Sequence, residues 1–526
     1  MVFPAQVESN SAGDSCTISV TETASPSTVI LGDVLLGTVI VASGQSNMEF
    51  TLPTIFGGQS IVRNASLVSV PTLRLLTVAK IPSEQPLDDV PGLEHSWRSS
   101  SPATICGQNE TDPEQPDYCI PHCGPSSVVP SFKRPTWGYF SAMGWLTGRQ
   151  LMLAHGLKTV GVVATSWGGT SIKLWSDTAA LETCGSSGSS SSSATDLESS
   201  GGTEGAAGVG PSQLYNAMIH PLLGMPVRGF VWYQGEADSG SFEKASAYAC
   251  QLPTMVRSWR SGWVSIPSSR REEQGTPFVA VQLAPWVTSP SVMDLRLSQT
   301  NVTSAGPGAS YVPAIDRADP TSPCGDVHIR GKLQLGQRVA ARMASAWGLP
   351  AGPSGNTGTG PVPETASISG AASVLVTLSV ASEHQLPLRR LAIQNQTTAE
   401  ATSNTDVLMG TAVESATWVR ANFTIVPPSR VGGCSSGTYG GAVDAGHLAV
   451  QVPDGASTDV LVLGVRYAWD CVPAGEQVVD AGAVPMAPWA FLVTDASHDG
   501  APETPTLVPA PVGKQLPGKN GKLSCN

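Results

Sequence analysis

The sequence predicts an α/β fold with a parallel sheet over residues 34–349, followed by a separate all-β domain over residues 364–496. In the first part, apolar runs of strand length alternate with apolar residues at helical spacing, a pattern typical of βαβ units. In the last part, the pattern changes to short β-rich runs. Residues 350–363 hold Gly, Pro, Ser and Thr with few apolar residues, which predicts a linker. Residues 497–526 are Pro-rich and are expected to form a flexible tail.

The composition is that of a globular protein large enough for more than one core. The chain has 526 residues, of which 41% are hydrophobic and 13% are charged. Acidic residues exceed basic ones, and the formal net charge of −12 argues against nucleic acid or an anionic membrane surface as a partner. No run approaches the roughly 18 to 20 apolar residues of a membrane span.

Cysteines and glycosylation sequons together indicate an oxidising compartment, so we expect a secreted or lysosomal glycoprotein with disulfides. Among the 10 cysteines, Cys119 and Cys123 flank His122, but no fourth ligand stands at zinc-finger spacing, and disulfides are the better interpretation. No signal peptide is visible, which conflicts with this compartment, and the alternatives are a mature product, a fragment or an N-terminally truncated chain whose gene model starts late. The sequons begin at Asn64, Asn109, Asn301, Asn395 and Asn422.

The first predicted elements lead to a turn that contains a serine. Residues 1–33 are expected to contribute remnant strands of a β-rich N-terminal region. The apolar run Val34–Ala42 predicts a buried strand that ends in the turn Gly44–Met48, with Ser46 at its centre. Such a turn exposes the serine hydroxyl, and a neighbouring base can then activate it as a nucleophile. Residues 51–135 are rich in Pro and Ser and are expected to be loops tied by disulfides.

A glycine pair follows the second predicted strand. Apolar residues at helical spacing after Phe140 predict a helix, and Val160–Ala164 predicts the strand after it. That strand ends in a turn containing Gly168 and Gly169, whose backbone N–H groups can approach a ligand closely. Residues 185–211 are dominated by Ser and Gly and are expected to form a disordered surface insertion.

The remaining strands of this part are again followed by polar residues. Gly229–Tyr233 predicts a strand that leads into Gln234 and Glu236, and Phe278–Leu283 predicts another that precedes a helix. His328 comes shortly before a last helix, whose apolar residues repeat every four positions. Because ligands bind at the carboxyl ends of the strands in open α/β sheets, we expect these polar residues to share one site.

Three motifs in this order resemble those of the sialate O-acetylesterases, a family of the SGNH hydrolase superfamily. They are Gly-Gln-Ser-Asn-Met at the serine turn, Ser-Trp-Gly-Gly-Thr at the glycine pair and Trp-Tyr-Gln-Gly-Glu after the third strand, followed by the histidine before the last helix. The resemblance spans about residues 30–490. It implies a flavodoxin-like SGNH hydrolase domain with three α/β/α layers. Related plant and bacterial carbohydrate acetylesterases share the serine and Gln-Gly-Glu motifs. These motifs therefore indicate the class of enzyme but do not identify its substrate.

The resemblance also implies roles for the residues of these motifs. Ser46 would be the nucleophile, and His328 would be the general base that activates it. The oxyanion would be held by the Ser46 N–H, by a backbone N–H of Gly168 or Gly169, and by the Gln234 side chain. Metal ions and organic cofactors would have no part in this chemistry.

Several acids are candidates to orient His328. SGNH enzymes commonly place Asp three residues before the catalytic histidine, but Gly325 stands there in this sequence. Asp326, two residues before His328, is our choice. Glu236 is equally a candidate to support Gln234 at the binding site. The alternatives to Asp326 are Asp316, Asp319, Glu236 or a Ser-His dyad without an acid.

The function implied by the resemblance is that of a serine esterase acting on O-acetyl esters of sugars, preferably 9-O-acetyl sialic acid. The expected partner is therefore an acetylated sugar or glycoconjugate. Within the same class, an acetylesterase of xylan or another polysaccharide is the alternative. A catalytically inactive carbohydrate-binding relative is the alternative from another class, but retention of Ser46, Gln234 and His328 argues against it, because a binding module needs no nucleophile.

Overall fold

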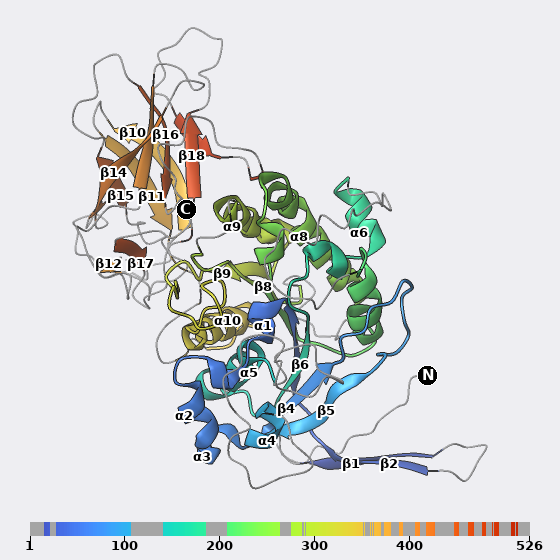
Figure 1. The fold of residues 1–526 in the computed structure, drawn as a ribbon. Helices are drawn as coiled ribbons and strands as arrows, with labels where there is room; N and C mark the ends of the chain where they lie inside the picture. Colours follow the sequence, from blue (N-terminus) through green and yellow to red (C-terminus); the bar gives the residue numbers. More distant parts are fainter. Residues whose placement is uncertain are drawn as a thin grey trace, which may run out of the picture.

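The computed structural model describes residues 15–21, 28–106, 140–185, 208–263, 275–286, 289 and 291–350, and a set of strands and single residues beyond residue 350. Its largest sheet has seven strands in the order β5-β4-β6-β3-β7-β8-β9 (Figure 1). All neighbours in this sheet are parallel except β4 and β5. The predicted α/β class is therefore confirmed. The strands are β3 (Thr38–Gly44), β4 (Val70–Val78), β5 (Leu93–Ser100), β6 (Val160–Ser166), β7 (Gly229–Tyr233), β8 (Phe278–Val281) and β9 (Ala309–Val312).

Helices cover both faces of this sheet (Figure 1). A side chain at Gly229 of β7 would meet Met343 of α10 at 2.8 Å, whereas the next residue, Phe230, packs its ring against Trp259 of α8. Since successive residues of a strand point to opposite faces, α10 and α8 lie on different sides. The helix α5 packs with α10. The main helices are α5 (Ala142–His155), α6 (Thr178–Thr183), α8 (Phe242–Gly262), α9 (Val292–Thr300) and α10 (Lys332–Ala346).

The segment after the serine turn is more regular than predicted. We expected loops over residues 51–135, but two strands of the large sheet, β4 and β5, fall inside it. The antiparallel strand β5 has a mostly exposed pattern without the apolar run of a buried strand, which explains why the sequence did not reveal it. Residues 107–139 lie outside the described residues. The short helices here are α1 (Ser46–Glu49), η1 (Leu52–Thr54), α2 (Gly58–Arg63), α3 (Ala65–Val68) and α4 (Pro102–Cys106).

Further short helices follow the central strands. They are η3 (Ile172–Trp175), η4 (Tyr215–Ile219), η5 (His220–Leu222), η6 (Glu236–Asp238) and η7 (Asn301–Ala305). The predicted insertion over residues 185–211 falls between η3 and η4, and most of it lies outside the described residues.

Two antiparallel strands precede the large sheet. They are β1 (Cys16–Thr21) and β2 (Thr28–Val34), at the place where remnant strands were predicted. They pair only with each other and extend away from the large sheet (Figure 1). Residues 28–33 of β2 are exposed, so this pair does not contribute to the core.

The region beyond residue 350 contains antiparallel strands that pair in the closed order β10-β11-β15-β14-β13-β16-β18-β19, and a separate pair of β12 and β17. The predicted tail is wrong in part, because residues 506–509 form β19 and Ala510 is buried, its N–H donating to the Ala490 carbonyl at 2.8 Å. The strands are β10 (Val362–Ser369), β11 (Ser373–Ser379), β12 (Arg389–Ala392), β13 (Thr405–Gly410), β14 (Thr417–Val426), β15 (His447–Gln451), β16 (Leu461–Tyr467), β17 (Glu476–Val479), β18 (Trp489–Val493) and β19 (Thr506–Pro509).

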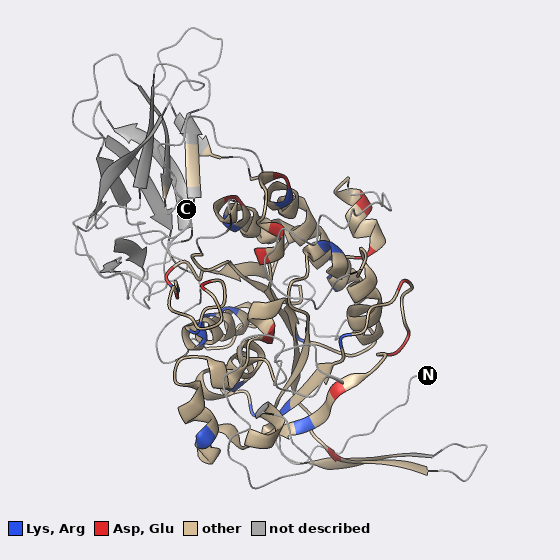
Figure 2. Cartoon of the chain, in the orientation of Figure 1, with Lys and Arg blue, Asp and Glu red and all other residues tan. Residues whose placement is uncertain are grey.

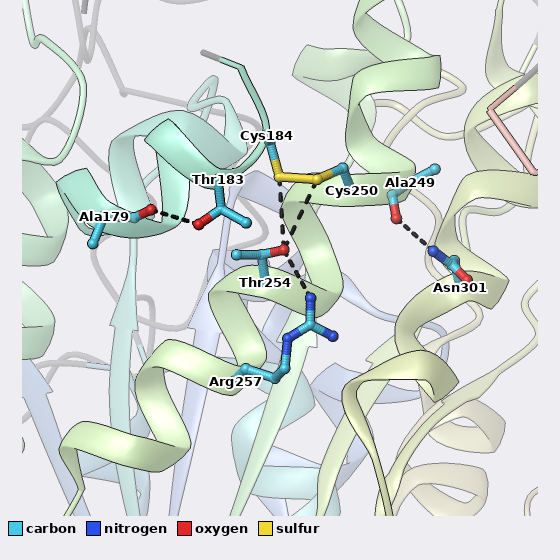
Figure 3. Close-up of a disulfide and its surroundings, with 8 residues drawn as sticks. All are labelled: Ala179, Thr183, Cys184, Ala249, Cys250, Thr254, Arg257 and Asn301. Carbon is cyan, nitrogen blue, oxygen red and sulfur yellow. Dashed lines mark hydrogen bonds between the residues drawn. A yellow bond between two sulfur atoms is a disulfide. The ribbon is translucent and has the colours of Figure 1, made fainter. Parts of the chain in front are cut away.

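A disulfide between Cys184 and Cys250 joins the end of α6 to α8 (Figure 3). Thr254, one turn further along α8, lies 3.6 Å from the Cys184 sulfur and accepts a hydrogen bond from Arg257. Cys324 is also disulfide-bonded, whereas Cys16 is a free thiol. The prediction of disulfides is therefore confirmed.

Charged residues of both signs are interspersed over the described helices and strands of the α/β part (Figure 2). Among the residues that the structure describes, none of the helices has the length and apolar content needed to cross a membrane.

Candidate active site

The carboxyl ends of three adjacent strands meet at one place, as predicted from their polar motifs. The chain leaves β3 at Gly44, whose carbonyl accepts a hydrogen bond of 3.0 Å from the Trp167 N–H beyond β6. The next amide, Gln45 N–H, donates to the Tyr233 carbonyl at the end of β7, also at 3.0 Å. The serine turn is therefore bonded to both neighbouring strand ends.

The conformation of this turn requires glycine at its first position. Gly44 has a φ of 142°, and a Cβ there would lie 2.1 Å from the Tyr233 carbonyl oxygen. The turn places Ser46 as the first residue of α1. Its N–H has no partner within the helix, because the first amides of a helix never do. Ser46 is 9% exposed, so its hydroxyl lies at the edge of the buried region.

His328 reaches this serine from the loop before α10. The Nε2 atom of the imidazole lies 2.9 Å from the Ser46 Oγ, and Nδ1 lies 2.7 Å from the Cys324 carbonyl oxygen. A carbonyl only accepts hydrogen bonds, so Nδ1 carries the proton and Nε2 presents its lone pair to the serine hydroxyl. This is the tautomer that a general base for Ser46 requires.

The surroundings of His328 favour its neutral form. Burial lowers the pKa of the imidazole to about 4, and the charge of Lys332 adds to this effect. The hydrogen bond to the Cys324 carbonyl and the charge of Asp326 act in the opposite direction. At neutral pH the imidazole is therefore uncharged and able to accept a proton.

The candidate acids differ in their surroundings. Asp326 influences His328 through its charge, while the hydrogen bond from Nδ1 goes to the Cys324 carbonyl. Asp316 is paired with Arg317 and Arg338, which hold the pKa of this carboxyl well below its usual range although burial opposes them. Of these two acids, Asp326 is the one whose charge raises the pKa of His328.

Asp319 is likewise held by an arginine. Its two carboxylate oxygens accept hydrogen bonds of 2.7 and 2.6 Å from the guanidinium of Arg330, and the Arg330 N–H donates to it as well. Arg330 follows His328 by two residues, so this pair anchors the loop.

The two glycines of the predicted oxyanion site differ in their hydrogen bonding. Gly168 N–H donates to the Glu49 carboxylate at 2.5 Å. Gly169 is exposed and has a φ of 73°, and its N–H has no acceptor among the described residues. Of the pair, Gly169 is therefore the one with an available donor.

The Gln234 side chain lies in a different place from the one predicted. It is fully buried, and its amide nitrogen has acceptors in Asp238 Oδ2 at 2.5 Å, the Thr170 carbonyl at 3.0 Å and Gln45 Oε1 at 3.1 Å. Its two N–H groups are thus already used, and neither is left for an oxyanion. Gln234 instead connects the serine turn and the glycine turn.

Asp238 and not Glu236 is the carboxylate that supports Gln234. Besides accepting from Gln234, it accepts a hydrogen bond of 2.9 Å from the Ile172 N–H. Burial raises the pKa of Asp238 to about 6, against the effect of these hydrogen bonds. Sequence reasoning missed Asp238, although its position one helical turn after Gln234 was visible.

Glu236 belongs to a second buried network next to Ser46. Its Oε1 accepts a hydrogen bond of 2.5 Å from the Asn47 amide, which also donates to the Val327 carbonyl at 2.8 Å. Lys332 donates to the Asn47 Oδ1 at 2.7 Å, and burial lowers the pKa of this lysine to about 7. Asn47 therefore ties the residue after the serine to the residue before His328.

Comparison with known families assigns the central part of the chain. Residues 143–345 match the family model described as "Carbohydrate esterase, sialic acid-specific acetylesterase". This part of the chain is therefore similar to the esterase family. Carbohydrate esterases are carboxylic ester hydrolases, and the predicted family resemblance is confirmed. The glycine turn, Gln234 and His328 lie within the matched residues, whereas the serine turn precedes them.

Named relatives agree with this family similarity. The chain is 31% identical over 355 residues to a sialate O-acetylesterase of Homo sapiens, covering 64% of this chain and 58% of that protein. It is 30% identical over 349 residues to a sialate O-acetylesterase of Mus musculus, covering 60% of this chain and 58% of that protein. The match thus spans little more than half of the length of these curated relatives.

A solved structure has a similar fold over most of the chain. It is a carbohydrate acetylesterase from Xanthomonas citri with a TM-score of 0.62 and 24% sequence identity, covering 89% of this chain and 83% of that one. At this identity the likeness concerns the fold alone, and it agrees with the α/β arrangement described above.

Proposed function

We propose that this chain is a serine esterase that hydrolyses O-acetyl esters of sugars through an acetyl-Ser46 intermediate. The observation that carries the proposal is the hydrogen bond of 2.9 Å between His328 Nε2 and Ser46 Oγ, with Nδ1 of the same imidazole bonded to the Cys324 carbonyl. A serine whose hydroxyl faces the free lone pair of a neutral imidazole is the arrangement of an activated nucleophile.

The reaction would proceed in two half-reactions. His328 takes the proton of Ser46 Oγ as this oxygen attacks the acetyl carbonyl, and it then gives the proton to the leaving sugar hydroxyl. The Ser46 and Gly169 N–H groups are the donors proposed for the oxyanion. Water, activated by His328 in the same way, then cleaves the acetyl-serine and releases acetate. The Asp326 charge stabilises the imidazolium that forms in each step.

We infer that the preferred substrate is 9-O-acetyl sialic acid, because the named relatives are sialate O-acetylesterases. Acetylated xylan or another polysaccharide is the alternative substrate, and an inactive carbohydrate-binding protein is the alternative function. The retained Ser46-His328 hydrogen bond supports activity over the latter.

The domain borders and the compartment belong to the same proposal. We infer an SGNH domain over residues 34–349 and a separate β domain in a secreted or lysosomal glycoprotein. The β domain begins at β10, inside the predicted linker 350–363, and includes β19, beyond the predicted end at residue 496. Asn64 is exposed, whereas the Asn301 amide nitrogen donates to the Ala249 carbonyl at 2.6 Å (Figure 3). Of these two sequons, we therefore expect glycosylation at Asn64.

The test measures acetate release from 9-O-acetyl sialic acid and, in parallel, from acetylated xylan. Wild type is compared with Ser46→Ala and with Ser43→Ala, a control at a buried serine of β3, and circular dichroism verifies folding. We expect Ser46→Ala to abolish release and Ser43→Ala to retain it, and the faster substrate identifies the preferred sugar. Equal activity of Ser46→Ala and wild type would refute the mechanism, and a folded wild type that releases nothing from either substrate would refute the function.

A further inference from the structure

Glu49 lies next to the serine turn but has no role in the mechanism above. It is the last residue of α1, three positions after Ser46, and it is 5% exposed. One carboxylate oxygen, Oε2, accepts the Gly168 N–H at 2.5 Å, and the other, Oε1, lies 3.0 Å from Lys80 Nζ. Glu49 thus connects the nucleophile turn to the glycine turn.

The glycine turn packs directly against the serine turn at this point. A Cβ at Gly168 would lie 2.9 Å from the Glu49 Oε2 and 3.3 Å from the Ser46 Cβ. The preceding amide, Trp167 N–H, is bonded to the Gly44 carbonyl at 3.0 Å. Two successive amides of the glycine turn are therefore held by the serine turn, and Gly169 N–H is the first one that remains available.

The orientation of Glu49 is set by a buried lysine. Lys80 Nζ lies 3.0 Å from the Glu49 carboxylate and 3.0 Å from the Glu94 carboxylate of β5. Burial raises the pKa of Glu49, and the charge of Lys80 opposes this effect. One ammonium between two carboxylates means that loss of the Glu49 charge would still leave a neutral Lys80-Glu94 pair.

We propose that Glu49 is a positioning residue of the esterase, which holds the glycine turn against Ser46 by accepting the Gly168 N–H and so places the Gly169 N–H for the oxyanion. The inference rests on the proposed function and deepens it at the same site. Glu49 does not itself touch the substrate in this scheme. Its contribution is geometric, and a misplacement of about 1 Å in an active site can cost ~100-fold in rate.

The test compares two substitutions of similar size. Glu49→Gln keeps an oxygen acceptor for the Gly168 N–H, whereas Glu49→Met removes it. We expect Glu49→Met to lower kcat for acetate release by ~10- to 100-fold with little change in KM, and Glu49→Gln to retain kcat within about threefold of wild type. Rates are expressed per serine labelled by a fluorophosphonate at saturation, so that unfolded protein does not contribute.

Glu94→Gln is the matched control, because it removes the other carboxylate of Lys80 and leaves Glu49 in place; we expect nearly wild-type kcat. Equal kcat values for Glu49→Met and wild type would overturn the positioning role alone, provided that Ser46→Ala is inactive. A higher kcat for Glu49→Met would overturn it as well, since it would mean that the carboxylate blocks the Gly168 donor. If wild type itself released no acetate, this inference would fall together with the proposed function.

Discussion

The imidazole of His328 is neutral at physiological pH because of its surroundings, and this makes a pH dependence predictable. Its pKa is lowered to about 4, chiefly by burial and further by the charge of Lys332. A general base works only when unprotonated, so kcat/KM should be constant between about pH 5 and 8 and should fall below about pH 4. Removing the charge with Lys332→Met should raise the His328 pKa and move this acid limb to higher pH.

The measurement is a pH profile of kcat/KM for acetate release by wild type, Lys332→Met and the exposed-lysine control Lys158→Met. Circular dichroism at each pH separates loss of the base from acid unfolding. A Lys332→Met limb that stays at the wild-type pH, or moves to lower pH, would contradict the electrostatic role given to this lysine.

Asp316 is a second residue whose substitution separates structure from catalysis. Its carboxylate and the Arg338 guanidinium are 9% and 3% exposed, and they form hydrogen bonds of 2.8 and 2.7 Å. Asp316→Asn leaves a buried arginine without its counter-ion, which typically costs about 3 to 5 kcal/mol. We expect unfolding at a markedly lower urea concentration. In the folded protein, the pH at which kcat/KM falls on the acid side should be unchanged. A shifted limb would instead favour Asp316 as the acid that acts on His328.

At the residue scale, the sequence was sufficient for the groups whose identity is tied to a local turn. The turn that holds Ser46 could be predicted, because an apolar run that ends in glycine indicates a strand followed by a turn. Sequence could not reveal that the partner of His328 Nδ1 is the backbone carbonyl of Cys324, since any residue type supplies a carbonyl. Nor could it reveal that the Gln234 amide is already used by Asp238, because that depends on rotamers in a buried network.

At the scale of elements, the sequence predicted the buried strands that have continuous apolar runs and missed elements without such a run. The strands β6, β7 and β8 lie where continuous apolar runs predicted them, because strands of a parallel sheet are covered on both faces. The short strand β9 carries too few residues to stand out. The helix α8 was also missed, because it contains Pro253 and its sequence near Tyr248 to Thr254 shows no simple apolar repeat.

The loop between β9 and α10 is tethered by a disulfide at Cys324, four residues before His328, and we expect this tether to matter for catalysis. Cys324 is disulfide-bonded, and its carbonyl oxygen fixes the His328 tautomer. Cys324→Ser keeps the carbonyl but releases the tether, so the imidazole samples more orientations. We expect kcat to fall by roughly tenfold with a smaller change in KM.

The matched control removes a different disulfide by Cys184→Ser with Cys250→Ser, which unties α6 from α8. Loss of a disulfide commonly costs about 2 to 5 kcal/mol, so both variants should have lower Tm values. Only the Cys324 variant should lose kcat per labelled serine. Equal losses of kcat in both would mean that the disulfides act through general stability alone.

At the scale of the whole molecule, residues from the far end of the chain complete the surface of the α/β part. Gly513 approaches α8 so closely that a Cβ there would lie 3.1 Å from the Ser246 carbonyl and 3.3 Å from the Ala249 Cβ. Ala510 is buried in the same hydrophobic core as the helices of the sheet. The strand β19, which comes directly before Ala510, pairs with β10 and β18.

This arrangement predicts that a chain ending after Pro505 is less stable than one ending after Lys514. The shorter chain loses β19 and the contacts of Ala510 and Gly513, which exposes apolar surface of α8. Each kcal/mol lost should lower Tm by about 2 to 4 °C in a domain of 150 to 250 residues. We expect differential scanning calorimetry to show a lower Tm for the α/β part in the shorter chain and a wild-type Tm in the longer one. Identical transitions in both would mean that these C-terminal contacts do not stabilise the esterase domain, because the truncations differ only in residues 506–514.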